Sequence, residues 1–155
     1  MNLTGTPVRP SEEKGVNPRL DNNIIGNSGL SQADRDAKVR EDRVTEIGQA
    51  IVQGREDDAL ALLRKGPITL ISRNFIMRNA ANRGALQIVA YFLEQTGLDP
   101  FSDAQRGSYV VLAAQRGYLP VIEKLLANGP ITKDDRQSAI QQAFAARHEL
   151  VADKL

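Results

Sequence analysis

The chain has 155 residues, of which 41% are hydrophobic and 25% are charged, and its formal net charge is +1. This length and composition suit a globular domain with a real core, and the small net charge argues against bulk attraction to nucleic acid or to an anionic membrane. Cysteine is absent, so disulfides and cysteine metal sites are excluded and a reducing compartment such as the cytoplasm is favoured. No apolar run approaches the roughly 20 residues of a membrane span.

The first 30 residues are polar and rich in glycine and proline, with only isolated apolar residues such as Ile24 and Ile25. Such a segment cannot bury enough apolar surface to offset its ordering entropy, so we predict a disordered leader over residues 1–30. A plain flexible tail is one interpretation, and an export or targeting leader that needs no hydrophobic segment is the other. Residues 31–155 are predicted to form the folded domain.

Short amphipathic helices are predicted along the rest of the chain. Ser31 and Asp34 have the spacing of a capping box that opens a helix, and the charged run after them leads into the first pair. Ser102 and Thr132 are predicted to cap later helices in the same way. The helices are expected at about 43–53 and 57–63, 73–83 and 86–95, two within 102–129, and 132–146 followed by one from about 149.

An internal repeat organises these helices. RGYLPVIEKLL at 116–126 matches RGALQIVAYFL at 83–93, and GPIT occurs at both 66–69 and 129–132. The anchoring positions, which are 30, 33 and 30 residues apart, are Gly54, Gly84, Gly117 and Arg147. We predict four repeats at about 43–66, 67–97, 98–129 and 130–155, because one such helix pair cannot bury its apolar face alone.

This pattern resembles the ankyrin repeat. The second-helix motif of that family, G-H-L-E-I-V-x-L-L-L-x-x-G, corresponds to residues 117–129 and 84–93, and its first-helix motif, T-P-L-H-L-A-A, to 108–114 and 75–81. The paired alanines match and the T-P-L-H tetrapeptide does not. GPIT or GLDP stands where the family has its β-hairpin connector, so those hairpins are expected to be short or absent.

The resemblance implies an all-α, helical-repeat solenoid of about four ankyrin-like repeats that binds another protein, with no catalysis. Binding is expected through the inter-repeat loops and the exposed side of each first helix. Divergent repeats of this kind are similar to those of bacterial effector proteins, which act inside a host cell. A regulatory or targeting domain of a larger enzyme or secreted effector is the alternative function.

Four arginines recur at one position of the repeat: Arg43, Arg73, Arg106 and Arg136. Stacked repeats would place them in a column beside the N-termini of the first helices. One interpretation is structural, with each guanidinium bonded to loop carbonyls or carboxylates, because the planar fork suits such bridging. The other is a stripe that binds an acidic partner. The predicted partner-binding residues are Arg73, Arg78, Asp103, Arg106, Lys133, Asp134 and Arg136.

No catalytic, metal or cofactor site is predicted. His148 is the only histidine, and it occupies the turn between two predicted helices. Adjacent carboxylates at 57–58 and 134–135 do not share a helix face and form no acid–base dyad. The aromatic residues are expected to pack in the core or between repeats: Phe75, Tyr91, Phe92, Tyr109 and Phe144. The expected partner is therefore a protein, bound by a monomer.

Overall fold

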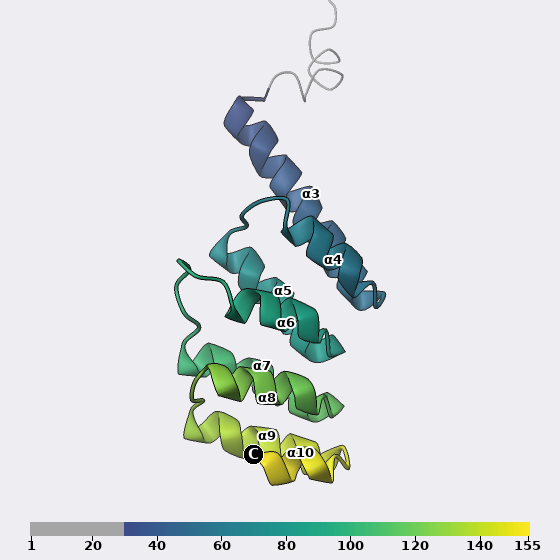
Figure 1. Cartoon of the computed structure of the whole chain (residues 1–155), viewed down its shortest axis with the longest axis vertical. Coiled ribbons are helices and arrows are strands. Elements are labelled where there is room, and N and C mark those ends of the chain that lie inside the picture. The colour runs from purple at the N-terminus through teal and green to yellow at the C-terminus, as the bar shows by residue number, and fades with distance from the viewer. Residues whose placement is uncertain (1–29) are drawn as a thin grey trace, which may run out of the picture. The chain divides into compact units, whose positions relative to one another are not determined.

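The structure, a computed structural model, describes residues 30–155, which fall into two units divided between Glu41 and Asp42. The leader predicted over residues 1–30 therefore lies outside the described residues except at its last position. All regular structure between residues 30 and 155 is helical, which confirms the all-α prediction for that part of the chain (Figure 1).

Eight helices follow one another through the described residues, and they agree closely with the predicted ranges. They are α3 (Gln32–Val52), α4 (Glu56–Leu63), α5 (Leu70–Arg83), α6 (Leu86–Leu93), α7 (Asp103–Arg116), α8 (Leu119–Asn128), α9 (Lys133–Ala145) and α10 (Glu149–Lys154). The helix opened at Ser31 and the first helix of the first predicted repeat form the single helix α3. The amide of Asp34 donates to Ser31 Oγ at 3.1 Å, so the predicted cap forms.

Local sequence explains where the later helices begin and end. Thr69 and Thr132, the last residues of the two GPIT segments, each accept a hydrogen bond from an amide in the first turn of the next helix. Ser102 forms a full capping box with Gln105, as predicted. Gly117 ends α7 in the left-handed region at φ 80°, which glycine adopts without steric cost.

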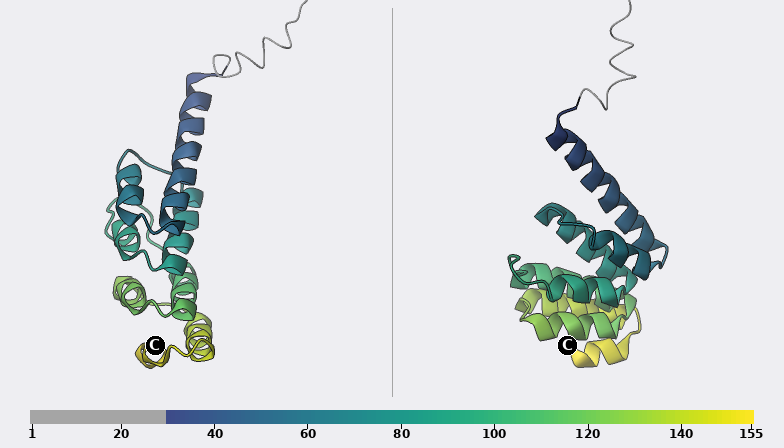
Figure 2. Two further views of the ribbon diagram at one scale, coloured as in Figure 1. Left: turned by 90° about the vertical axis from the view of Figure 1, so that its right-hand side faces the viewer. Right: turned by 45° about the horizontal axis from the view of Figure 1, so that its top comes forward.

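Two layers of helices make up the second unit. Helices α5, α7 and α9 pack side by side in chain order, and so do α4, α6 and α8 (Figures 1 and 2). Each of α5, α7 and α9 also packs against the helix that follows it. Two pairs of fully buried alanines, at 80–81 and 113–114, allow α5 and α7 to approach closely, and Ile76 and Val110 fill the space around them.

The aromatic side chains divide between the core and the surface. Phe92 and Tyr109 are buried, and the rings of Phe101 and Tyr109 pack edge to face with their centroids 5.6 Å apart. The prediction of a packed role is wrong for Phe144, which is 57% exposed, whereas Phe75 is 52% exposed but has one edge of its ring against Gly48 of α3. Helix α9 packs against α7 and α10, and neither covers Phe144.

Candidate interaction surface

Three of the four repeated arginines are buried and bond the connectors: Arg43, Arg73 and Arg106. Arg43 and Arg106 are 8% and 5% exposed. Arg43 donates to Gly66 O at 3.0 Å and to Pro67 O at 2.8 Å. Arg106 donates to Pro130 O at 2.9 Å and to Phe101 O at 2.8 Å. Both guanidinium groups therefore bond the loop that leads to the next helix pair, and Arg106 also bonds the loop that precedes its own helix.

Arg73 follows the same scheme with fewer partners, whereas Arg136 bonds a carbonyl just after α10. Arg73, 4% exposed, donates from Nη1 to Asp99 O at 2.8 Å and stacks on the Phe101 ring with Cζ 4.1 Å from its centroid. Its Nε is buried and meets no acceptor among the described residues. Arg136 is half-buried and donates to Leu155 O.

The structure separates the other predicted partner-binding residues. Asp103 is exposed and forms an ion pair with Arg106 at 2.7 Å. Lys133 and Asp134 are exposed in the first turn of α9, whereas Arg78 is exposed farther along α5. Burial leaves Arg73 and Arg106 almost no side-chain surface for a docked protein. The carbonyl bonds explain the arginine at position 106, whereas at position 73 they leave Nε without an acceptor among the described residues.

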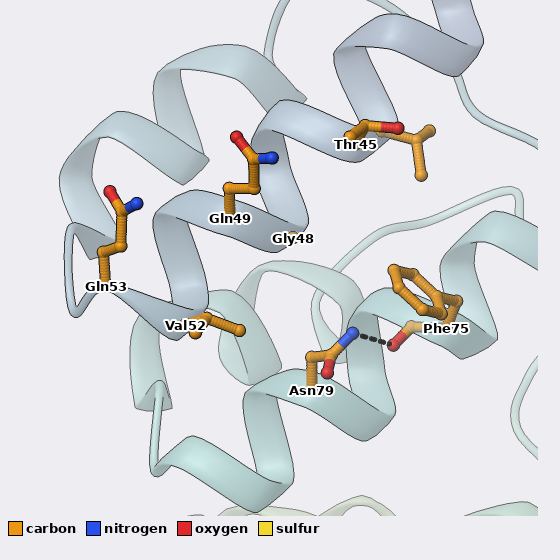
Figure 3. Close-up of a pocket in the computed structure, with 8 residues that line it drawn as sticks. Thr45, Gly48, Gln49, Val52, Gln53, Phe75 and Asn79 are labelled. Carbon is orange, nitrogen blue, oxygen red and sulfur yellow. Dashed lines mark hydrogen bonds between the residues drawn. The ribbon is translucent and has the colours of Figure 1, made fainter.

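A groove of about 320 Å³ lies between α3 and α5 (Figure 3). On the α3 side it is lined by Val44, Thr45, Gly48, Gln49, Val52 and, just after the helix, Gln53; on the α5 side by Phe75 and Asn79. Phe75 is 52% and Val52 47% exposed, so apolar surface faces solvent there. None of the lining residues is charged.

Glycine at position 48 allows the aromatic ring of Phe75 to lie against α3. A Cβ added at Gly48 would stand 3.4 Å from Phe75 Cε1, in ordinary van der Waals contact at its near limit. Asn79 Nδ2 donates to Phe75 O at 3.1 Å, which holds the amide beside the ring (Figure 3). The groove thus combines an apolar floor with amide groups from Gln49, Gln53 and Asn79, which can donate and accept hydrogen bonds.

Sequence reasoning missed this groove. Val44, Gly48 and Val52 recur every four residues, which places them on one face of α3. Phe75 and Asn79 have the same spacing on α5. The signal was therefore present, but an isolated phenylalanine at a helical spacing is more often a core residue, and only the packing of α5 beside α3 leaves its ring at the surface.

The described residues offer little for chemistry. No group of three or more histidine, aspartate or glutamate side chains among them could hold a metal ion. His148 begins α10, and its ring lies against Gly117, where an added Cβ would come within 2.6 Å of Nδ1. Between residues 30 and 155, no helix combines the length and the apolar character that crossing a bilayer requires.

Residues 30–155 thus define an all-helical protein whose helices pack in two layers and expose an uncharged apolar groove. Comparison of the chain with protein-family models, with curated proteins and with solved structures gave no match. The resemblance to ankyrin repeats therefore depends on the sequence motifs alone.

Proposed function

We propose that this chain is a protein-interaction module built as an ankyrin-like helical-repeat solenoid, with short connectors in place of β-hairpins. The repeat spacing, the buried alanine pairs and the side-by-side packing of α5, α7 and α9 support this architecture. The first helices of such an array present one continuous exposed side, which is where a partner would bind. We place its action in a cytoplasm, its own cell's or a host's, in keeping with the absence of cysteine.

The half-exposed ring of Phe75 in the groove between α3 and α5 is the observation that carries this proposal. Aromatic residues that remain at a surface beside other apolar groups are typical anchors of protein interfaces. Because no lining residue is charged, the groove suits an apolar side chain of the partner, with its backbone hydrogen-bonded to the amides of Gln49, Gln53 or Asn79. The exposed residues Arg78 and Lys133 remain candidates for polar contacts.

Paired phenylalanine variants test the proposal. Phe75→Ala and Phe144→Ala remove the same ring from positions of similar exposure, 52% and 57%, on different helices. The purified proteins are immobilised, and the proteins that each retains from a cell lysate are quantified by mass spectrometry. We expect at least one partner that wild type and Phe144→Ala retain and that Phe75→Ala loses by about 30-fold, the effect of losing an interface hot spot.

Two controls make the result interpretable. Circular dichroism and the unfolding midpoint of Phe75→Ala must match those of Phe144→Ala, so that lost binding reflects the groove and not the fold. A photo-crosslinking residue at Gln53, which lines the groove, should capture the same partner. Equal retention of every partner by both variants, or crosslinking to none of them, would show that this groove is not the binding surface.

A further inference from the structure

A second pocket, of about 110 Å³, lies beside α5 and α6 and has a buried guanidinium in its wall. Apolar side chains form most of the lining: Leu63, Ile68, Phe92 and Leu98. Arg73 is the charged residue that lines it, and only 4% of that residue is exposed. Burying a positive charge among apolar groups is costly unless its hydrogen-bonding groups are all satisfied.

Arg73 is the repeated arginine whose bonding is incomplete. The Nε of Arg106 donates to Pro130 O at 2.9 Å, whereas the Nε of Arg73 is buried and meets no acceptor among the described residues. Arg106 also donates to Phe101 O, Asn128 Oδ1 and Asp103, while the one hydrogen bond of the Arg73 side chain within residues 30–155 is to Asp99 O. An orphaned donor inside a folded protein requires a specific explanation, since nearly all buried donors are paired.

The connectors explain this difference. A Cβ added at Gly129 would lie 2.7 Å from Arg106 Cζ, so that connector is pressed onto its guanidinium. Gly66 is in ordinary van der Waals contact with Arg43, with 3.5 Å between an added Cβ and Nη1. Gly97, at the corresponding place beyond Arg73, has nothing within 4 Å of an added Cβ. The connector after α6 therefore bonds the guanidinium of Arg73 through Asp99 O but brings no acceptor among the described residues to its Nε.

We propose that this pocket binds a carboxylate carried on a short apolar group, with Arg73 as its anchor. A guanidinium edge takes a carboxylate through parallel hydrogen bonds, and one negative charge neutralises the one buried positive charge. The walls formed by Leu63, Ile68 and Phe92 would receive the apolar part of the ligand. A doubly charged phosphate would leave excess charge among these apolar walls, so the carboxylate is the better match.

The guanidinium is already held in place for this task. Its Nη1 is fixed by Asp99 O at 2.8 Å, and its plane is fixed by stacking on the Phe101 ring. Binding therefore costs Arg73 little conformational entropy, whereas a flexible surface arginine would have to be ordered. This site does not depend on the groove at Phe75, and either could fail without the other.

The probe is 3-methylbutanoate, a carboxylate with the branched alkyl group of a leucine side chain, and its matched control is 3-methylbutanamide. Binding to the full chain is followed by NMR through the Nε–H resonance of Arg73, assigned by its loss in Arg73→Met. We expect a saturable shift of this resonance with a dissociation constant on the order of 1 mM for so small a ligand, and none with the amide. A short peptide ending in leucine, with a free or an amidated C-terminus, distinguishes a peptide terminus from a free acid as the source of the carboxylate.

Three variants complete the design, with backbone amide shifts and the unfolding midpoint as readouts. Arg73→Met should weaken carboxylate binding by about 10-fold to 100-fold, the loss of a charge-assisted hydrogen bond, whereas Arg83→Met removes an exposed arginine from the same helix and should change nothing. Leu98→Trp keeps Arg73 and fills the pocket from a residue that is 46% exposed, so it should weaken binding even if Arg73→Met fails to fold.

Several results would overturn the proposal. An amide that binds as tightly as the carboxylate would exclude recognition by charge, and equal losses in Arg73→Met and Arg83→Met would indicate general electrostatics. An unmoved Arg73 resonance at saturating probe, or full binding by Leu98→Trp, would mean that the pocket takes solvent only. If the peptide with a free C-terminus binds more tightly than 3-methylbutanoate, the natural ligand is a peptide end. If the peptide binds more weakly, the natural ligand is a small free acid.

Discussion

Replacing Arg106 by methionine should destabilise the second unit by about 3 kcal/mol. The variant keeps the length and apolar stem of the side chain but leaves Phe101 O and Pro130 O without their donor. Phe101 is 5% exposed, so water reaches its carbonyl poorly and the loss there is about 2 kcal/mol. Pro130 is exposed, and partial solvation of its carbonyl reduces the second loss to about 1 kcal/mol. The ion pair with Asp103, whose side chain is 56% exposed, adds little.

The matched control is Arg116→Met on the same helix. Arg116 is exposed and makes one hydrogen bond, to Asn82 Oδ1 at 3.3 Å, so its loss should change the free energy of unfolding by no more than about 0.5 kcal/mol. Urea unfolding followed by circular dichroism gives both values by linear extrapolation. Arg106→Lys should recover less than half of the loss, because an ammonium cannot reproduce the planar fork. Arg106→Met and Arg116→Met of equal stability would refute a role for Arg106 in holding the connector.

Three further outcomes are expected in the same unfolding assay. Gly117→Ala should lower the free energy of unfolding by about 1–2 kcal/mol more than Gly54→Ala does. Both glycines have φ near +80°, but only at Gly117 would the new Cβ meet a ring, that of His148 at 2.6 Å. Arg147→Gly should stabilise the chain by about 1 kcal/mol by relieving a non-glycine φ of 65°. Burial raises the pKa of the Tyr109 phenol above 10.0, so its contribution to stability is complete below pH 10.0 and is lost as the pH rises through the folded-state pKa. From about pH 8 to about pH 11, Tyr109→Phe should therefore lose less stability than wild type.

The helices could be predicted from the sequence because the forces that begin and end them are local. The capping oxygens of Ser102 and Thr132 lie within three residues of the amides that they bind. Gly84 and Gly117 end their helices through their own backbone conformation, at φ 72° and 80°. None of these features needs a partner from elsewhere in the chain, so their spacing predicted the helix ranges closely.

Burial depends on how distant segments pack, and there the sequence was a poorer guide. The repeat placed Arg43, Arg73 and Arg106 at equivalent positions, but it could not show whether these side chains are buried and bonded to loop carbonyls or exposed as a stripe that binds a partner. Apart from Phe101 O, which is five residues from Arg106, their carbonyl partners in the loops lie 23 to 26 residues away, and the path of those loops depends on how the helices pack. Phe75 and Phe144 were assigned to packing because they are apolar, yet the neighbouring helices leave about half of each exposed.

The same arginine position serves two different ends because the connectors differ. GPIT at 129–132 is the tight connector: its glycine lies against the guanidinium of Arg106, and Pro130 O completes the bonding of Nε. The connector at 94–102 is the longest of those between helix pairs, and Gly97, at φ 80°, has nothing within 4 Å of an added Cβ, so this glycine does not lie against Arg73. Its length leaves one edge of a fixed, buried guanidinium beside a pocket without altering the helices on either side. The length and path of the loop alone can therefore decide whether the arginine at this position is fully bonded, as at Arg106, or keeps an Nε that can bind a ligand, as we propose for Arg73.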